Sequence, residues 1–332
     1  MLKIGVIGAG HLGKIHLNCI RQIPHFQLIG FFDINPEIVY EVKNEFGLQA
    51  FDSFEDLISS VDVIDIVTPT FAHFEYAAYA LKRFKHVFIE KPIVATPEEA
   101  LLLMDIANEA SVKVQVGHVE RFNPAFIAAL PYFENPMFIE SHRLSGFNNR
   151  GIDVPVILDL MIHDIDIILN VVKANIRKIS ASGVAIISNT ADIASARLEF
   201  DNGCVANLTA SRVSLKTMRK SRFFQRDAYI SVDFLNKEAE IVRIKSLNGK
   251  QPDPLLPLLD PGNGKEARQL FFEHPVIQPI NAIQTELMSF AEAILANTSP
   301  PVTILDGYQA LLVSQQILEK VNDSLEKIQV LT

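Results

Sequence analysis

The chain has 332 residues, enough for one large domain or two ordinary ones, and its 48% hydrophobic and 21% charged content is typical of a globular protein with a sizeable core. The net charge of −9 argues against nucleic acid or an acidic membrane surface as a partner, and no apolar run approaches the ~20 residues that cross a bilayer. Two cysteines exclude a disulfide framework, and the N-terminus shows no signal peptide, so we expect a cytoplasmic protein.

Apolar runs alternate with helical periodicity from residue 3 to about 117. The runs are continuously apolar, as expected where helices cover both faces of a parallel sheet. The pattern therefore predicts an α/β fold of the Rossmann type, a doubly wound parallel sheet. Ser53 and Thr96 have N-cap spacing and predict two of the helix starts. The expected strands are 3–8, 26–33, 62–68, 86–90 and 112–117, and the expected helices are 11–23, 36–46, 72–84 and 97–110.

A G-x-G-x-x-G motif lies between the first expected strand and the first expected helix. In this position glycines permit a tight turn and let backbone amides approach a pyrophosphate, while the helix N-terminus favours its negative charge. A tight turn without a ligand is the alternative interpretation. The residues expected to contact a dinucleotide here are Gly8, Gly10, His11, Leu12 and Gly13.

Asp33 ends the second expected strand, twenty residues after Gly13. A carboxylate at this place can accept both ribose hydroxyls of the adenosine half. Residues 34–36 include no Arg or Lys to hold a 2′-phosphate, so the sequence favours NAD over NADP.

Polar residues follow the next two expected strands where each strand ends. Ligands bind at the carboxyl ends of the strands in open α/β sheets, so we expect these residues near the nicotinamide. A lysine there can hold a substrate oxygen, but Lys91 could also be an ordinary solvated residue, and His73 could simply begin a helix. The candidates are Thr68, Pro69, Thr70 and His73 after one strand, and Glu90 and Lys91 at the end of the other.

The pattern changes after residue 120, so we expect an NAD-binding domain at 1–120 and a substrate-binding and oligomerisation domain at 121–332. Partly alternating strand candidates follow, joined by turns such as Asp201-Asn202-Gly203, and predict an α+β domain with a mainly antiparallel open sheet. The expected strands are 175–187, 193–200, 204–211, 228–234 and 239–244, the expected helices are 155–173, 281–297 and 306–325, and 249–267 is an expected surface loop.

The stretch ILDLMIHDIDIIL at 157–169 is apolar except for three aspartates and a histidine. At about 100° per residue, Asp159, His163, Asp166 and Asn170 fall in one stripe of a helix, and Asp164 lies elsewhere. An aspartate that orients a histidine suits a general base near neutral pH. A structural Asp-His pair, a solvent-facing stripe and a metal pair are the alternatives; a metal would need a third ligand that the sequence does not place, so we expect none.

A basic segment reverses the overall charge locally. It could bind a diphosphate through bidentate arginine contacts, or it could be a solvated loop and strand edge protected by charge. Its cations are Arg212, Lys216, Arg219, Lys220, Arg222 and Arg226.

These motifs in this order resemble the Gfo/Idh/MocA oxidoreductase family, over essentially the whole chain. The resemblance implies a catalytic group of Lys91, Asp159 and His163, a cis Lys91-Pro92 bond, and a homodimer or homotetramer formed through the C-terminal sheet. One departure is visible, because many members have Asn where this chain has Thr70.

Within the family, VGHVERFNPA at 116–125 and the segment before the 157–169 helix are similar to nucleotide-sugar enzymes of the UDP-N-acetylglucosamine 3-dehydrogenase type. The resemblance implies NAD-dependent oxidation of a sugar ring hydroxyl, with a nucleotide-linked hexosamine oxidised at C3. A free polyol, inositol or sugar acid is an alternative substrate, and a non-catalytic NAD-binding sensor is a further alternative. The residues then expected on the substrate side are Arg121, Asn123, Arg143, Arg150 and Arg212.

Overall fold

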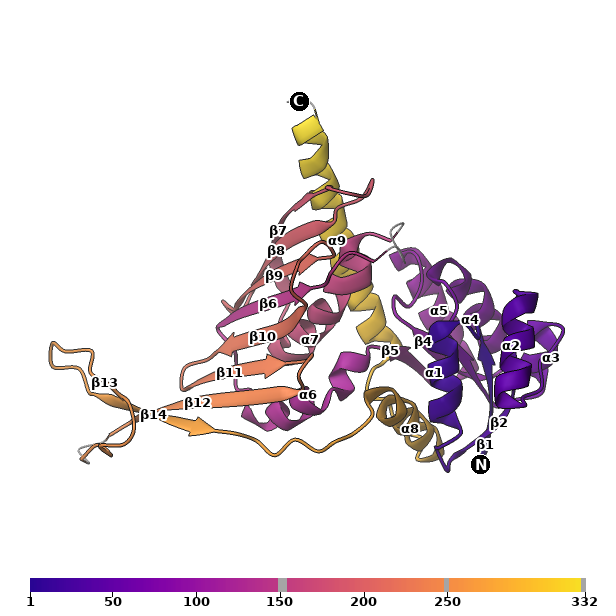
Figure 1. Cartoon of the computed structure of the whole chain (residues 1–332), viewed down its shortest axis with the longest axis horizontal. Helices are drawn as coiled ribbons and strands as arrows, with labels where there is room; N and C mark the ends of the chain where they lie inside the picture. The colour runs from indigo at the N-terminus through magenta and orange to yellow at the C-terminus, as the bar shows by residue number, and fades with distance from the viewer. Residues whose placement is uncertain (149–153, 248–250, 330–332) are drawn as a thin grey trace. The chain divides into compact units, whose positions relative to one another are not determined.

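The computed structural model describes residues 1–148, 154–247 and 251–329 (Figure 1). Contacts between Cα atoms divide the chain into two units. Unit 1 comprises Met1–Phe122 and Asn281–Val313, and unit 2 comprises Asn123–Ile280 and Ser314–Thr332. The sequence led us to expect all of 121–332 in one domain, whereas the contacts group Asn281–Val313 with the N-terminal residues. The division into functional domains at residue 120 stays a prediction.

Unit 1 contains a parallel sheet of five strands in the order β2-β1-β3-β4-β5. Strands β3 and β5 are buried along their whole length, which explains why their sequences are apolar apart from Asp65 and Gln115. The strands are β1 Leu2–Ile7, β2 Phe26–Phe32, β3 Val63–Ile66, β4 His86–Glu90 and β5 Val114–Gly117. The doubly wound parallel sheet expected from the sequence is confirmed.

The helices of unit 1 begin where the sequence places their caps. The Ser53 side chain accepts a hydrogen bond from the Asp56 amide, and Thr96 forms a capping box with Glu99. The late helix α8 (Ala282–Leu295) joins this unit because it packs against α1 and β4, where Phe290 meets Phe88. The other α-helices are α1 His11–Ile20, α2 Pro36–Phe46, α3 Phe54–Ser59, α4 His73–Leu81 and α5 Pro97–Ala110, and short 3₁₀ turns lie at η1 Thr70–Ala72 and η2 Val119–Phe122.

The sheet of unit 2 has nine strands within the described residues, in the order β13-β14-β12-β11-β10-β6-β9-β8-β7. All neighbouring pairs are antiparallel except β6 with β9, which are parallel. The mainly antiparallel sheet is confirmed, including the hairpin at Asp201-Asn202-Gly203. The strands are β6 Phe138–Leu144, β7 Ile176–Val184, β8 Ile193–Phe200, β9 Val205–Ser211, β10 Met218–Phe224, β11 Ala228–Asp233, β12 Glu238–Ser246, β13 Leu258–Leu259 and β14 Arg268–Glu273.

Helices cover one face of this sheet (Figure 1). Burial alternates along β8 and β9, so each strand turns one row of side chains to the helices and the other row outward. The helices are α6 Pro124–Ala129, α7 Ile162–Val172 and α9 Ile304–Gln329, together with the short turns η3 Leu130–Tyr132 and η4 Ile157–Met161. Helix α9 contributes its first residues to unit 1 and the rest to unit 2. In the described ranges, no helix combines the length and the apolar character needed to span a membrane.

Candidate functional site

The G-x-G-x-x-G turn is closely packed at two glycines and open at the third. Gly8 has φ +91°, and a Cβ there would lie 2.7 Å from the Val67 carbonyl oxygen. A Cβ on Gly13 would lie 2.1 Å from the Gly8 oxygen, whereas a Cβ on Gly10 would meet no protein atom within 4 Å. Gly10 caps α1 without a side-chain hydrogen bond, so the helix amides remain available to a ligand. The turn therefore fits a dinucleotide pyrophosphate approaching Gly10.

Asp33 is fixed beside this turn at the end of β2. Its Oδ2 accepts a hydrogen bond from the Ala9 amide at 2.7 Å, and its Oδ1 accepts one from the Asn35 amide at 2.8 Å. The carboxylate is half-buried, and its free lone pairs can accept ribose hydroxyls. This arrangement fits the adenosine ribose of NAD.

The segment that follows β3 lies against the same glycine turn. Thr68 Oγ1 is buried, and no protein group in the described part of the chain hydrogen-bonds it. The Cγ2 of Thr68 would lie 2.9 Å from a Cβ on Gly8, so this side chain packs directly over the glycine turn. Pro69 is exposed, and Thr70 begins the short turn η1. An orphaned hydroxyl at this place fits a cofactor that supplies the missing partner.

His73 holds two loops together. Its Nε2 lies 2.8 Å from the Thr68 carbonyl oxygen, and its Nδ1 lies 2.9 Å from that of Pro92. The ring is almost fully buried, and burial lowers the pKa of His73 more than these carbonyl groups raise it. His73 thus connects the segments that follow β3 and β4, and its expected contact with the cofactor stays a prediction.

Lys91 follows β4 at the carboxyl edge of the sheet. Its side chain is half-buried, and the Lys91-Pro92 peptide bond is cis, as the family resemblance implied. The preceding Glu90 is buried and accepts a hydrogen bond from the Lys91 amide at 3.1 Å. Lys91 therefore stands at the edge where sheets of this class bind ligands.

Glu90 also belongs to a buried charge cluster that the sequence did not reveal. His16 of α1 lies between Asp65 of β3 and Glu90, with its Nδ1 2.9 Å from Asp65 Oδ2 and its Nε2 3.3 Å from Glu90 Oε1. The signal in the sequence was a histidine on the buried face of the first helix and an aspartate within an apolar strand. Neither feature identifies the partner, because the pairing depends on how the elements pack.

The Asp159-His163 segment is not a regular α-helix. Residues Ile157–Met161 form a π-helical turn, and the α-helix α7 begins at Ile162. Asp159 lies in the π turn and His163 in the first turn of α7, and both side chains are half-buried. A π turn changes the angle between successive side chains, so the stripe deduced from α-helical spacing does not hold across it. Such turns are frequent at functional sites.

The third acidic residue of this segment has a separate explanation. Asp164 is buried and accepts hydrogen bonds from Arg143 of β6, at 3.2 Å from Nε and 2.9 Å from a terminal nitrogen. This bidentate pair neutralises both charges inside unit 2. Arg143 is itself only 2% exposed, and its expected role as a substrate contact stays a prediction.

Two further residues expected on the substrate side have protein partners. The Arg121 guanidinium donates to Asp306 at the start of α9, at 3.1 Å. Asn123 caps α6 through the Ala125 amide and donates to the Phe234 carbonyl oxygen at 2.9 Å. Both contacts stabilise the fold, and the expected roles of Arg121 and Asn123 on the substrate side stay predictions. Arg150 lies outside the described residues, and its role stays a prediction.

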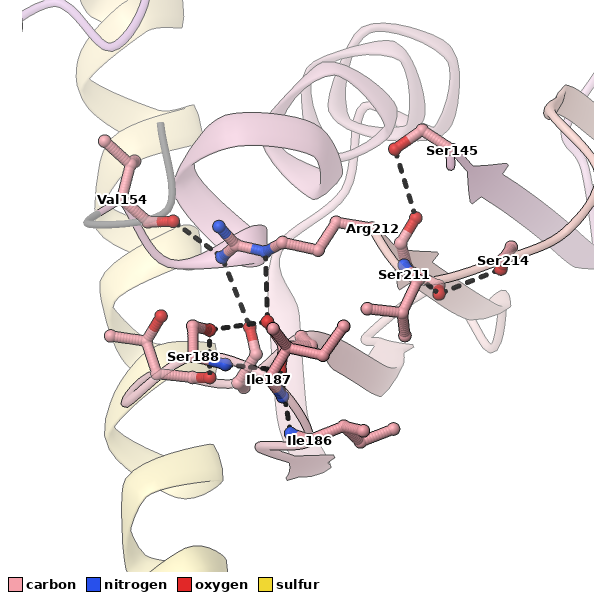
Figure 2. Close-up of polar contacts among 12 residues, drawn as sticks. Ser145, Val154, Ile186, Ile187, Ser188, Ser211, Arg212 and Ser214 are labelled. Carbon is pink, nitrogen blue, oxygen red and sulfur yellow. Dashed lines mark hydrogen bonds and ion pairs between the residues drawn. The ribbon is translucent and has the colours of Figure 1, made fainter. Parts of the chain in front are cut away.

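Arg212 occupies a buried network shown in Figure 2. Its guanidinium donates to the Val154 carbonyl oxygen at 2.6 Å and lies 3.6 Å from the Asp192 carboxylate. Asp192 accepts hydrogen bonds from three successive amides, those of Ile186, Ile187 and Ser188, and from the Ser188 hydroxyl. Burial would raise the pKa of Asp192, but these hydrogen bonds lower it to about 2. Arg212 thus links the β7–β8 loop to Val154, in the segment before η4, and its expected role as a substrate contact stays a prediction.

Two further cations of the basic segment, Lys220 and Arg222, lie on the same face of the unit 2 sheet. In β10 the side chains of Ser221 and Phe223 are buried, so Lys220 and Arg222 point to the opposite face of the sheet. Arg222 lies 3.6 Å from Glu140 of the neighbouring β6. Strand β10 pairs with β11 on one side and β6 on the other, so the strand-edge interpretation is wrong for these two residues, and the diphosphate site stays a prediction.

Three comparisons agree on the family of this chain. Residues 2–118 match the model of the oxidoreductase family with an NAD-binding Rossmann fold (GFO_IDH_MocA), and residues 136–225 match the GFO/IDH/MocA C-terminal domain. UDP-N-acetylglucosamine 3-dehydrogenase of Acidithiobacillus ferrooxidans is 42% identical over 72% of this chain and 76% of its own. A crystal structure described as that enzyme superposes with a TM-score of 0.88, with 35% identity over 98% of both chains. Scyllo-inositol dehydrogenase of Lactobacillus casei, with bound NAD(H) and scyllo-inositol, shares the fold at TM-score 0.75 and 22% identity over 97% of both chains.

Proposed function

This chain belongs to the Gfo/Idh/MocA family of NAD-binding oxidoreductases, and from that premise we propose that it oxidises the C3 ring hydroxyl of a nucleotide-linked hexosamine to a keto-sugar. The observation that carries the proposal is the likeness to UDP-N-acetylglucosamine 3-dehydrogenase along almost the whole chain. Lys91, Asp159 and His163 of this sequence supply the catalytic side chains that the family resemblance implies.

The cofactor of the proposed reaction is NAD. Gly10 and the amides of α1 would hold the pyrophosphate of NAD. Asp33 would hold its adenosine ribose, and the Thr68 hydroxyl would contact the part of the cofactor that crosses the glycine turn. Bound NAD supplies the hydride acceptor. No Arg or Lys stands at 34–36 to pair with a 2′-phosphate, and the Asp33 carboxylate would repel one, so NAD is preferred to NADP.

The proton of the sugar hydroxyl goes to His163 as the hydride leaves the carbon. The Lys91 ammonium holds the same oxygen and stabilises the negative charge that develops on it. Asp159 orients the imidazole of His163 and favours its protonated form. Lys91 belongs to unit 1, whereas Asp159 and His163 belong to unit 2, so their convergence on one hydroxyl is part of the proposal.

We further propose a homodimer or homotetramer formed through the outer face of the unit 2 sheet. Phe138, Phe224 and Tyr229 pack side by side on neighbouring strands of this sheet, and Phe224 is exposed. Exposed aromatic side chains of this kind favour association. Sedimentation at several protein concentrations tests this, with Phe224→Asp expected to shift the protein toward monomer. The cytoplasmic location stays a prediction.

A substrate panel tests the proposed function. The purified chain is incubated with NAD, a keto-acid that can reoxidise retained cofactor, and in parallel UDP-N-acetylglucosamine, other UDP-sugars, free hexosamines and inositols. We expect a product two hydrogens lighter, seen by mass spectrometry, from the UDP-hexosamine, with the carbonyl located at C3 by borodeuteride trapping. Oxidation of inositols alone would contradict the nucleotide-sugar assignment, and NAD binding with no product from any compound would favour a non-catalytic role.

A further inference from the structure

The buried cluster of His16, Asp65 and Glu90 lies within unit 1, beneath the edge that carries Lys91. His16 and Asp65 are fully buried and Glu90 is 8% exposed. The imidazole bridges the two carboxylates, one on each ring nitrogen, at 2.9 and 3.3 Å. The three residues come from α1, β3 and β4, so the cluster forms only when these elements pack.

The protonation of His16 sets the charge of the cluster. Its Nδ1 is hydrogen-bonded to Asp65, whereas its Nε2 lies 3.3 Å from Glu90 Oε1 at an ion-pair distance without hydrogen-bond geometry. Burial acts to lower the pKa of His16, but Asp65 and Glu90 together raise it well above its ordinary value, so the imidazole is doubly protonated. Two ionised carboxylates and this cation sum to one negative charge. The cluster therefore keeps one net negative charge.

The net negative charge of the cluster lies on Glu90. Among the residues that the structure describes, no group hydrogen-bonds Asp65 Oδ1, whereas Glu90 Oε2 accepts the Lys91 amide. Burial raises the pKa of Asp65, and His16 offsets only part of this. Burial also acts to raise the pKa of Glu90, but His16 and Lys91 lower it below its usual value. Glu90 is thus the carboxylate that stays ionised.

We propose that this fixed negative charge on Glu90 offsets the Lys91 ammonium and so lets the oxidised, positively charged nicotinamide bind beside Lys91. The inference rests on the proposed function, since it places NAD at this edge of the sheet. The oxidised ring carries a positive charge that is lost when it accepts a hydride, while the rest of the cofactor is the same in both forms. The ratio of NAD⁺ to NADH affinity therefore reports the charge near the nicotinamide alone.

Calorimetric titration of the full chain with NAD⁺ and NADH separately tests the proposal. Glu90→Gln keeps the shape but removes the negative charge from the Glu90 end of the cluster, so we expect NAD⁺ affinity to fall about tenfold and NADH affinity to change less than about twofold. Adding Lys91→Met to Glu90→Gln removes the positive charge of Lys91 as well and should restore the wild-type ratio. Equal weakening of both forms by Glu90→Gln would overturn the proposal, because Glu90 would then act by packing.

Asp65→Asn is the matched variant of the other carboxylate. Its amide can donate to His16 Nδ1 and leave the Nε2 proton facing Glu90, so we expect an affinity ratio within about twofold of wild type. A large change in this ratio would place the charge on Asp65 instead. His25→Gln, a half-buried histidine of the same unit, controls for loss of an imidazole.

Nitrogen NMR of the chain labelled in histidine tests the proton count without cofactor or activity. We expect His16 Nε2 to show the shift of a protonated nitrogen, identified by its loss in His16→Gln. An unprotonated Nε2 would overturn the proton assignment. Failure of wild-type protein to bind either form of the cofactor would instead contradict the proposed function, so the two failures are distinguishable.

Discussion

The carboxylate of Asp33 accepts a hydrogen bond from the Ala9 amide at 2.7 Å, which ties the end of β2 to the glycine turn before α1. A second amide, that of Asn35, fixes the other oxygen at 2.8 Å. The negative charge is thereby held at one place beside the turn, where it can accept ribose hydroxyls and repel a 2′-phosphate.

Asp33→Asn should therefore change cofactor choice. We expect NAD affinity to fall and NADP affinity to rise relative to it, so that the ratio of the two drops at least about tenfold. Calorimetric titration with each cofactor measures the ratio. Asp62→Asn is the matched control, because Asp62 also accepts a backbone amide, that of Lys3, at 2.8 Å. An unchanged ratio in Asp33→Asn would show that this carboxylate does not face the ribose.

Gly10 and Gly13 should respond differently to alanine. A Cβ at Gly10 meets no protein atom within 4 Å, so Gly10→Ala should keep the free energy of unfolding within about 1 kcal/mol of wild type. It should nevertheless weaken NAD at least about tenfold, because the methyl group occupies the path of the pyrophosphate. Gly13→Ala should destabilise the fold, since its Cβ would lie 2.1 Å from the Gly8 oxygen. Urea unfolding and cofactor titration separate the two effects, and full NAD affinity in Gly10→Ala would contradict the site.

The Arg143-Asp164 pair should behave as a buried ion pair. Arg143→Met or Asp164→Leu alone leaves a buried charge without its bidentate partner, so we expect each to lower the free energy of unfolding by about 3–5 kcal/mol. The double variant should recover a large part of that loss. Denaturant unfolding of the four proteins measures the coupling. Additive losses, together with a raised KM in Arg143→Met, would instead support the expected role of Arg143 on the substrate side.

Asp192 should contribute stability that depends on pH. Its folded pKa of about 2 lies below the ordinary value of 3.8, so the contribution is present above the ordinary value and is lost as the pH falls toward 2. Asp192→Asn should therefore cost about 2 kcal/mol near neutral pH. Its difference from wild type in the free energy of unfolding should shrink below about pH 4. The exposed Asp201→Asn serves as the control. A difference that stays constant down to the lowest pH would contradict this account of Asp192.

Local patterns in the sequence predicted much of the fold. Largely apolar runs such as Val63–Ile66 indicated a sheet covered on both faces, and Ser53 and Thr96 cap helices as their spacing indicated. The same reasoning found the glycine turn and Asp33, because a motif and its strand-turn-helix context lie close together in the sequence. Family resemblance, rather than spacing, supplied the cis Lys91-Pro92 bond.

Partners distant in the sequence could not be predicted in the same way. Arg143, Arg121 and Arg212 have the composition of a substrate site, yet the structure shows each with a carboxylate contributed by another element. The π turn at Ile157–Met161 also escaped prediction, since periodicity assumes a uniform angle per residue. A local sequence pattern indicates which side chains are buried, but it does not identify the group that each buried side chain contacts.

The central claim is that His163 and Lys91 act on one sugar hydroxyl beside bound NAD. The most direct measurement is the single-turnover rate of NADH formation after UDP-N-acetylglucosamine is mixed with the NAD-loaded chain, followed by absorbance. We expect a burst in wild type and in His25→Ala, and rates at least about a hundredfold lower in His163→Ala and Lys91→Ala. An undiminished rate in His163→Ala would contradict the account.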